Sequence, residues 1–127
     1  MNEQVVPSIL PTLKDWHFEI DFEGIAWAIL DREGESQNAL SRRVLEELGE
    51  IVATVESETA AKKLKGLVFI SGKPTGFIVG ADIREFDQLD TEQKVIEGLK
   101  PVNAMFERIE RMPVPVVAAI HGVCVGG

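Results

Sequence analysis

The residues best suited to take part in chemistry form two apolar runs that contain glycine, residues 77–86 (FIVGADIREF) and residues 118–127 (AAIHGVCVGG). Glycine lets the backbone approach a ligand closely, so each run can present backbone N–H groups where a side chain would obstruct. Two such donors that converge could hold the oxygen of a thioester. The sequence also stops inside the second run, without a helix cap, charged tail or turn, so we expect it to be the front piece of a longer protein.

The second run also permits a different chemistry. Gly122, Cys124 and Gly126 have the spacing of a nucleophile elbow, with cysteine in the serine position. This alternative predicts a thiol acyl hydrolase, in which the pKa of the thiol is low and alkylation is rapid. His121 is too near in sequence to act easily as the base, and no histidine follows it. The simpler interpretation is that Cys124 is a small, buried and inert residue in a strand.

Other candidate ligand sites have weaker support. Gly72 and Lys73 lack the earlier glycine that a phosphate-binding P-loop requires. Two isolated histidines, His17 and His121, are weak candidates for metal binding. The single cysteine, Cys124, rules out an internal disulfide and a cysteine-based metal cluster. The sequence therefore predicts no metal site.

The strands that would carry these runs follow from apolar spacing. Alternation over residues 16–22 predicts a strand with one buried face, and a tight turn at residues 23–24 leads to a second strand over residues 25–30. Continuous apolar runs predict fully buried strands within residues 66–70 and 114–120. The residues expected on the buried face of the first strand are Trp16, Phe18, Ile20 and Phe22.

Two long helices separate the later strands. Ser41 is the expected N-cap of the first, whose apolar residues recur at helical spacing over residues 44–55. Gly49 is expected to mark a close contact there, since glycine otherwise weakens a helix. The second helix is predicted over residues 90–112, with Pro101 kinking it or dividing it in two. Strands separated by helices imply an α/β fold with parallel crossovers.

Composition narrows the functional classes. The 127 residues suit one domain, and 45% hydrophobic with 27% charged residues is typical of a soluble globular protein. The net charge of −8 argues against nucleic-acid binding, which needs a basic surface. The N-terminus lacks a secretory signal, and no apolar run approaches the roughly 20 residues that span a bilayer. We therefore expect a cytoplasmic protein without a membrane span.

Three ordered motifs together carry a family resemblance. They are residues 38–41 (NALS) after the first hairpin, residues 77–83 (FIVGADI), and residues 113–122 (PVPVVAAIHG) followed by residues 126–127. In this order and spacing they resemble the signatures of the crotonase family, the enoyl-CoA hydratases and isomerases. The resemblance covers nearly the whole chain from Trp16 onward.

Within that family, Val79 before the glycine is most similar to the hydratase part of multifunctional fatty-acid oxidation alpha subunits. The resemblance implies an α/β, crotonase-like (ClpP/crotonase) spiral of ββα units that is incomplete here. Residues 1–15 would then be an N-terminal extension, and residues 16–127 the first part of an acyl-CoA-binding domain.

The resemblance also implies site residues. Ala81 and Gly127 match the two backbone donors that stabilise a thioester enolate in the family. Arg84 and Lys73 are candidates for the CoA phosphates because charge-assisted bonds to phosphate are strong, although Arg84 could equally be a solvated helix residue. Asp82 is expected to cap a short helix over residues 83–86. The positions that match the family's CoA contacts are Asn38, Ala39, Leu40, Gly80, Asp82, Ile83 and Arg84.

The implied activity is hydration of trans-2-enoyl-CoA to 3-hydroxyacyl-CoA in fatty-acid β-oxidation. The family's two catalytic glutamates follow the Gly-Gly motif, so this chain alone is expected to be inactive. No cofactor is expected here besides the CoA thioester substrate, with NAD possible in a downstream dehydrogenase region. The expected partners are further copies of the chain or a thiolase subunit. The alternatives are an isomerase or CoA-thioester hydrolase of the same fold, or a non-catalytic CoA-binding member.

Overall fold

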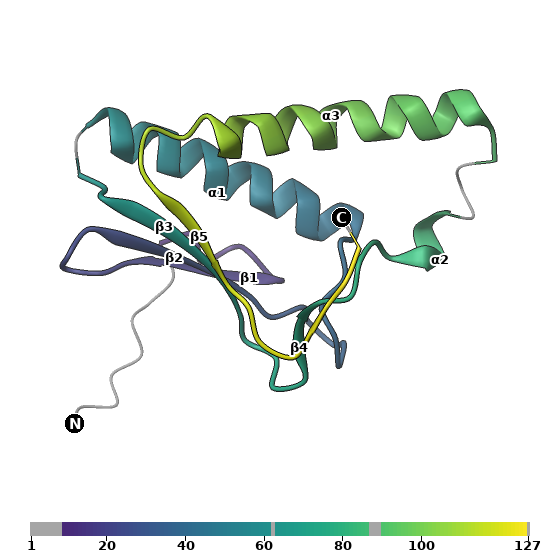
Figure 1. Ribbon diagram of the computed structural model, residues 1–127, viewed down its shortest axis with the longest axis horizontal. Coiled ribbons are helices and arrows are strands. Elements are labelled where there is room, and N and C mark those ends of the chain that lie inside the picture. The colour runs from purple at the N-terminus through teal and green to yellow at the C-terminus, as the bar shows by residue number, and fades with distance from the viewer. Residues whose placement is uncertain (1–8, 62, 87–89, 127) are drawn as a thin grey trace.

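One open sheet and two long helices form the main layers of the computed structural model, which describes residues 9–61, 63–86 and 90–126 (Figure 1). The first eight residues of the predicted N-terminal extension therefore lie outside the described residues. The elements are β1 (Trp16–Ile20), β2 (Ile25–Leu30), α1 (Arg42–Ala60), β3 (Gly66–Ser71), β4 (Gly76–Ile78), α2 (Ile83–Phe86), α3 (Glu92–Glu110), β5 (Val116–Ala119) and β6 (Val123–Cys124).

The predicted hairpin of β1 and β2 is confirmed, since the two strands pair antiparallel and Gly24 in the turn has φ +85°. The prediction that Phe22 belongs to the buried face is wrong, because β1 ends at residue 20 and Phe22 is 98% exposed. The carboxylate of Asp21 accepts the backbone N–H groups of Glu23 and Ile25 at 2.9 and 3.0 Å. These bonds start the turn before Phe22 can join the strand.

Helix α1 supplies much of the core. The predicted N-cap is confirmed, because the Ser41 hydroxyl accepts the Val44 N–H at 3.1 Å. Gly49 lies against the second long helix as expected, and a Cβ there would be 3.9 Å from the sulfur of Met105. The apolar side of α1 packs on the sheet, and the best-buried core side chains are Phe18, Leu30, Val44, Ile51, Val52, Val55 and Leu67.

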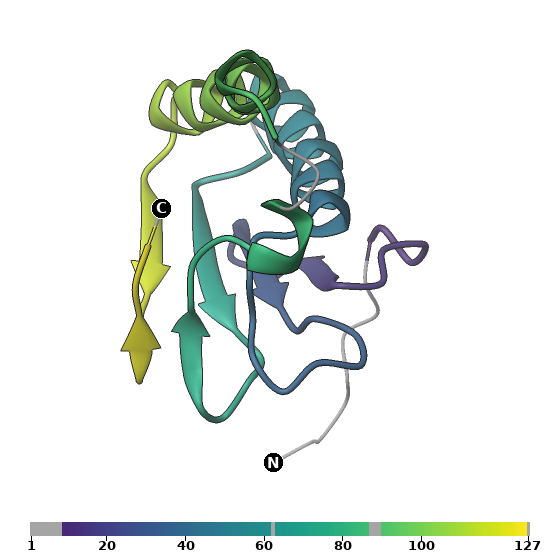
Figure 2. The same cartoon turned by 90° about the vertical axis from the view of Figure 1, so that its right-hand side faces the viewer.

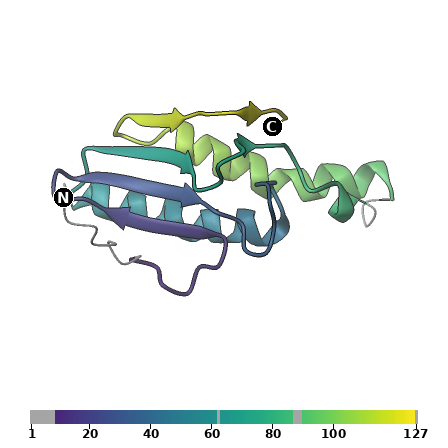
Figure 3. The same ribbon diagram turned by 90° about the horizontal axis from the view of Figure 1, so that it is seen from below.

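The sheet has the strand order β1-β2-β3-β5, and both β2–β3 and β3–β5 are parallel, which confirms the predicted α/β arrangement. The prediction of fully buried strands is wrong. Val68 and Ile70 are only half-buried, and Val117 and Ile120 are 54% and 57% exposed. Figure 3 gives the reason, because α1 and α3 lie on one face of the sheet. In the described part of the chain the other face is uncovered, so alternate residues stay accessible.

Helix α3 runs without interruption through Pro101, so of the two predicted effects, a kink or a division, the division into two helices is wrong. Proline deprives the carbonyl of Glu97, four residues earlier, of its usual donor. Both residues are exposed, and water can take the place of the missing N–H. Figure 2 shows α3 beside α1, on the same side of the sheet. Among the helices of the described residues, none has the length and apolar character needed to cross a membrane.

Candidate active site

The two glycine-containing runs meet in a small second sheet, where β4 and β6 pair in parallel and the Val125 N–H donates to the Ile78 carbonyl at 3.0 Å. Just beyond these strands Gly80 and Gly126 adopt φ values of +109° and +77°. Their backbones touch, because a Cβ on Gly126 would lie only 2.7 Å from the Cα of Gly80. The two runs therefore lie side by side, as two converging donors would require. Gly127, the second predicted donor, lies outside the described residues.

The Ala81 N–H points to the side of its segment that faces away from the NALS segment, with which Ala81 forms an isolated bridge through Leu40. The Gly80 carbonyl accepts the Leu40 N–H at 2.8 Å, and the Asp82 N–H donates to the Leu40 carbonyl at 3.2 Å. In a trans peptide the C=O and the following N–H point in opposite directions, so the Ala81 N–H points away from Leu40. No acceptor among the described residues takes it, and Ala81 is exposed. This amide is therefore available to an incoming carbonyl oxygen.

Asp82, the next residue, is buried and ion-paired. One carboxylate oxygen accepts the Arg84 N–H at 3.0 Å, which confirms the expected cap of α2, the short helix that begins at Ile83. The other oxygen accepts the Nη2 groups of Arg32 at 2.6 Å and Arg84 at 3.0 Å. Hydrogen bonds from Arg84 and then Arg32 hold the pKa of the Asp82 carboxyl far below its usual value. The carboxylate therefore stays ionised and fixed beside Ala81.

A shallow cavity of about 190 Å³ is lined in part by Ala81. Four of the predicted site residues come together there, namely the two alanines of the NALS and GAD motifs, Asp82 and Arg84. The small alanine side chains leave the backbone accessible, and the two arginines of the lining are both paired with lining carboxylates, Asp82 and Glu35. The lining residues are Arg32, Glu35, Ser36, Gln37, Ala39, Val79, Ala81, Asp82 and Arg84.

Asn38 lies behind the cavity rather than in it, and its side chain is buried. The amide nitrogen donates to the Leu30 carbonyl, the Ser71 hydroxyl and the Phe77 carbonyl at 2.9, 2.9 and 3.0 Å. Its amide oxygen accepts the Arg32 N–H at 3.1 Å. The predicted CoA contact of Asn38 stays a prediction, and the observed role of this side chain is to join β2, β3 and β4.

Lys73 is also engaged within the protein. Its ammonium donates to the carbonyls of Arg32 and Glu35 at 2.7 and 2.6 Å and pairs with Asp31 at 2.7 Å. The side chain is 12% exposed and does not line the cavity, whereas that of Arg84 is 64% exposed. Of the two cations predicted to meet the CoA phosphates, Arg84 is the one presented to solvent at the cavity.

The sequence and the fold both match known proteins. The family model described as enoyl-CoA hydratase/isomerase matches residues 22–127. The chain belongs to this family. The fatty acid oxidation complex subunit alpha of Idiomarina loihiensis is 42% identical over 114 residues, which cover 90% of this chain and 16% of that protein. The corresponding subunit of Acinetobacter baumannii is 42% identical over 107 residues, or 83% of this chain and 14% of that protein.

Solved structures of the enoyl-CoA hydratase/isomerase family share the fold. An enoyl-CoA hydratase/carnithine racemase from Magnetospirillum magneticum matches with a TM-score of 0.79 and 25% identity, over 91% of this chain and 42% of that one. An enoyl-CoA hydratase from Mycobacterium smegmatis matches with a TM-score of 0.74 and 24% identity, over 85% and 40%. These matches confirm the predicted incomplete crotonase-like fold. The chain spans about one-sixth of the length of the curated relatives it matches.

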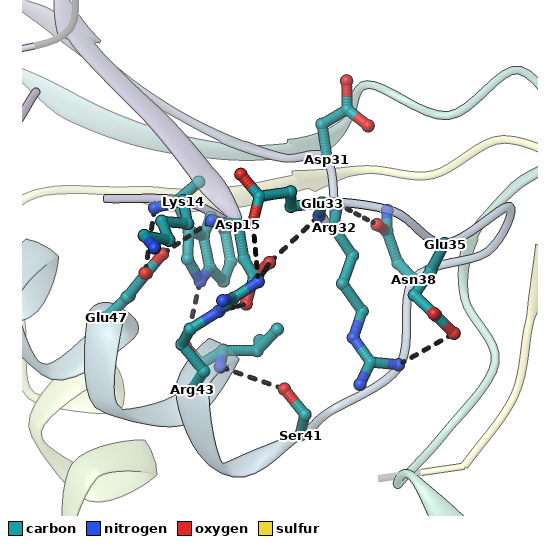
Figure 4. Close-up of polar contacts among 12 residues, drawn as sticks. Lys14, Asp15, Asp31, Arg32, Glu33, Glu35, Asn38, Ser41, Arg43 and Glu47 are labelled. Carbon is teal, nitrogen blue, oxygen red and sulfur yellow. Dashed lines mark hydrogen bonds and ion pairs between the residues drawn. The ribbon is translucent and has the colours of Figure 1, made fainter. Parts of the chain in front are cut away.

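Sequence reasoning missed a buried polar cluster that anchors the residue 31–38 loop of this family member (Figure 4). Asp15, 1% exposed, bonds Arg43 through Nη2 at 2.8 Å and accepts the Glu33 N–H at 3.0 Å. Burial alone would raise the pKa of Asp15, but the bonds from Arg43 and Glu33 outweigh it and lower the pKa. Glu47 in turn accepts the backbone N–H groups of Asp15 and Lys14. The one signal in the sequence was an acidic residue, Asp15, directly before an apolar strand.

The nucleophile-elbow alternative does not fit the observed geometry. Cys124 lies within β6, where it pairs with Ile78, rather than at the tip of a strand-to-helix turn. The prediction that this thiol is buried is wrong, because Cys124 is exposed. Strand β6 pairs with β4 along one edge, and nothing else in the described part of the chain covers it. The ring of His121 contacts the Lys73 carbonyl at 2.8 Å.

Proposed function

We propose that this chain is the first part of an enoyl-CoA hydratase that adds water to trans-2-enoyl-CoA thioesters in fatty-acid β-oxidation. The observation that carries the proposal is the Ala81 N–H, which has no acceptor among the described residues and belongs to a residue that lines the cavity and follows the Gly80–Gly126 contact. Negative charge develops on the thioester oxygen as water adds, and preorganised amides stabilise that charge more in the transition state than in the ground state. The N–H of Gly127 is the proposed second donor of this oxyanion hole.

The cavity suits the rest of a CoA thioester. Ala39 and Ala81 keep side-chain bulk away from the acyl group, and the exposed guanidinium of Arg84 can meet a phosphate. Gly80 and Leu40 contribute backbone that holds the donor peptide, and Ile83 begins the helix that follows it. Substrate binding would therefore use the cavity surface, while the buried residues behind it keep its shape.

The acid and base of the reaction are proposed to follow Gly127 in a longer protein, which we call the parent. Glu35, the glutamate at the cavity, already pairs with Arg84 at 2.9 Å, so it is a poor candidate for proton transfer. Relatives several times longer support such a parent. A downstream NAD-dependent dehydrogenase region, a thiolase partner and a cytoplasmic location belong to the same proposal.

The first test is hydration of crotonyl-CoA by the parent and by this chain, followed as the loss of the enoyl thioester absorbance. Activity is expected in the parent alone. Absence of hydration in a folded parent that binds CoA would overturn the hydratase assignment and favour an isomerase, a thioester hydrolase or a non-catalytic member.

The role of the Ala81 amide has a direct test in the parent. Ala81→Pro removes the donor and is expected to lower kcat by about 100- to 1,000-fold, the typical effect of losing one oxyanion donor. Ala81→Gly keeps the N–H and is the matched control, expected to retain most of the activity. Circular dichroism checks that both variants fold. Unchanged hydration by folded Ala81→Pro would refute the oxyanion assignment.

A further inference from the structure

Arg32 makes a long-range contact to the residue that follows the proposed oxyanion donor. It lies in the residue 31–38 loop between β2 and α1, and its side chain is only 12% exposed. Its Nη2 group donates to the Asp82 carboxylate at 2.6 Å, although the two residues are 50 positions apart. Figure 4 shows the Arg32 side chain reaching out of this loop beside Glu35. An Arg–carboxylate contact with so little exposure is stronger than the usual surface ion pair.

The backbone of Arg32 is fixed on both sides. Its N–H donates to the buried amide oxygen of Asn38 at 3.1 Å, and its carbonyl accepts the Lys73 ammonium at 2.7 Å. Lys73 holds the Glu35 carbonyl as well. The guanidinium is therefore delivered from an anchored loop, which gives it a defined position.

Asp82 connects the Arg32 guanidinium to the segment that carries Ala81. Its N–H donates to the Leu40 carbonyl, and its carboxylate caps α2 through the Arg84 N–H. The Arg84 guanidinium also bonds this carboxylate, but it is 64% exposed and competes with water. Arg32 is thus the sheltered partner of Asp82, one residue after Ala81.

We propose that Arg32 is a positioning residue of the enoyl-CoA hydratase, which through Asp82 sets the direction of the Ala81 N–H in the oxyanion hole. The inference rests on the proposed function, and it does not require Arg32 to touch the reacting oxygen. A preorganised donor is effective because its orientation costs nothing at the moment of reaction. A loosened donor loses that advantage.

The kinetic test uses Arg32→Gln in the parent. The expected result is a kcat for crotonyl-CoA hydration that falls about tenfold, since small misplacements of a reacting geometry cost one to two orders of magnitude. KM is expected to change less than twofold. Arg32→Lys is expected to restore part of kcat, because it returns the charge without the planar fork. The matched control is Arg108→Gln, which removes the partner of another carboxylate, Glu56, in the contact between α1 and α3, and is expected to leave kcat unchanged.

A spectroscopic test separates positioning from a merely structural role. Butyryl-CoA labelled with ¹³C at the thioester carbonyl binds without being hydrated, and its carbonyl stretch falls as hydrogen bonds to the oxygen strengthen. Folded Arg32→Gln is expected to show a higher stretching frequency than the wild type. Asp82→Asn gives a second route to the same test, and the double variant is expected to lose no more kcat than Arg32→Gln alone.

The outcomes distinguish this inference from the proposed function. A wild-type parent that does not hydrate crotonyl-CoA sinks the hydratase proposal. An active wild type whose folded Arg32→Gln variant keeps both kcat and the carbonyl frequency overturns only the positioning role. A loss confined to KM also overturns it, because it makes Arg32 a substrate contact. Additive losses in the double variant show that Arg32 does not act through Asp82 and refute the inference equally.

Discussion

Replacing Asn38 is expected to loosen the scaffold behind the cavity, because its amide joins three strands. The chosen change is Asn38→Ala in the parent. Two of the four groups that Asn38 bonds keep another partner in the variant. The Leu30 carbonyl still accepts the Gly72 N–H at 2.8 Å, and the Ser71 hydroxyl still accepts the Lys73 N–H at 2.9 Å.

The other two groups determine the magnitude. The Phe77 carbonyl and the Arg32 N–H have no further partner among the described residues, so Asn38→Ala leaves both unsatisfied. A buried polar group left without its partner costs about 1–3 kcal/mol. Both groups are only partly buried, which places each near the lower end and gives a total loss of about 2–3 kcal/mol. That loss corresponds to an opening equilibrium about 30- to 160-fold more favourable.

Amide hydrogen exchange of the parent, measured by mass spectrometry on peptides from β2 to β4, gives the free energy of local opening directly. Gln37→Ala is the control, since it removes a neighbouring amide that is exposed. Protection is expected to fall in the Asn38 variant and to stay unchanged in the control. Equal protection in the two variants would refute the bracing role derived from the contacts of Asn38.

Three further outcomes follow from single positions. Gly126→Ala is expected to lower hydration by the parent more than tenfold, because its Cβ would lie 2.7 Å from the Cα of Gly80. The control is Gly34→Ala, which has a similar positive φ but open space around it. Equal losses of activity in the two variants would refute steric contact as the cause. The stabilisation from ionised Asp82 is expected to be complete above the unfolded pKa of about 3.9 and to decline as pH falls toward the lower pKa of the folded state. Acid titration of Asp82→Asn should therefore show a shallower loss of stability below about pH 4 than the wild type shows. Phe22→Ser is expected to change local opening by less than about 0.5 kcal/mol in hydrogen exchange, since Phe22 is 98% exposed, and a larger loss would contradict its placement in the turn.

Local sequence patterns predicted the structure correctly where it depends only on neighbouring residues. Ser41 at the start of α1 and the glycine turn of the first hairpin both follow from rules that span a few residues. Phe22 shows the limit of such rules, because alternation continued through it while the Asp21 carboxylate had already turned the chain. The partial exposure of β3 and β5 could not be predicted, since it depends on which layers cover the sheet.

The candidate site likewise has a part that the sequence predicts and a part that depends on long-range contacts. Ala81, Asp82 and the neighbouring glycine form a motif, and a motif is visible in one sequence. The contact between Arg32 and Asp82 spans 50 positions, and the contact between Lys73 and the Arg32 carbonyl spans 41. Nothing in residue type or spacing distinguishes Arg32 from a solvated loop arginine. Only the folded arrangement, with Lys73 committed to this loop, reveals the difference.

The residue 31–38 loop illustrates how a polar segment can be well ordered without an apolar core. Asp15 holds the Glu33 N–H, Lys73 holds two carbonyls and Asn38 holds the Arg32 N–H, so side chains satisfy backbone groups on three sides of the loop. Each such bond contributes about 1 kcal/mol, which is enough together to limit local opening but small beside the core. The loop can therefore open while the sheet and α1 remain folded. Substitutions that remove one of these bonds should accordingly reduce the proposed activity before they reduce global stability, because the proposed orientation of the Ala81 N–H depends on a local structure.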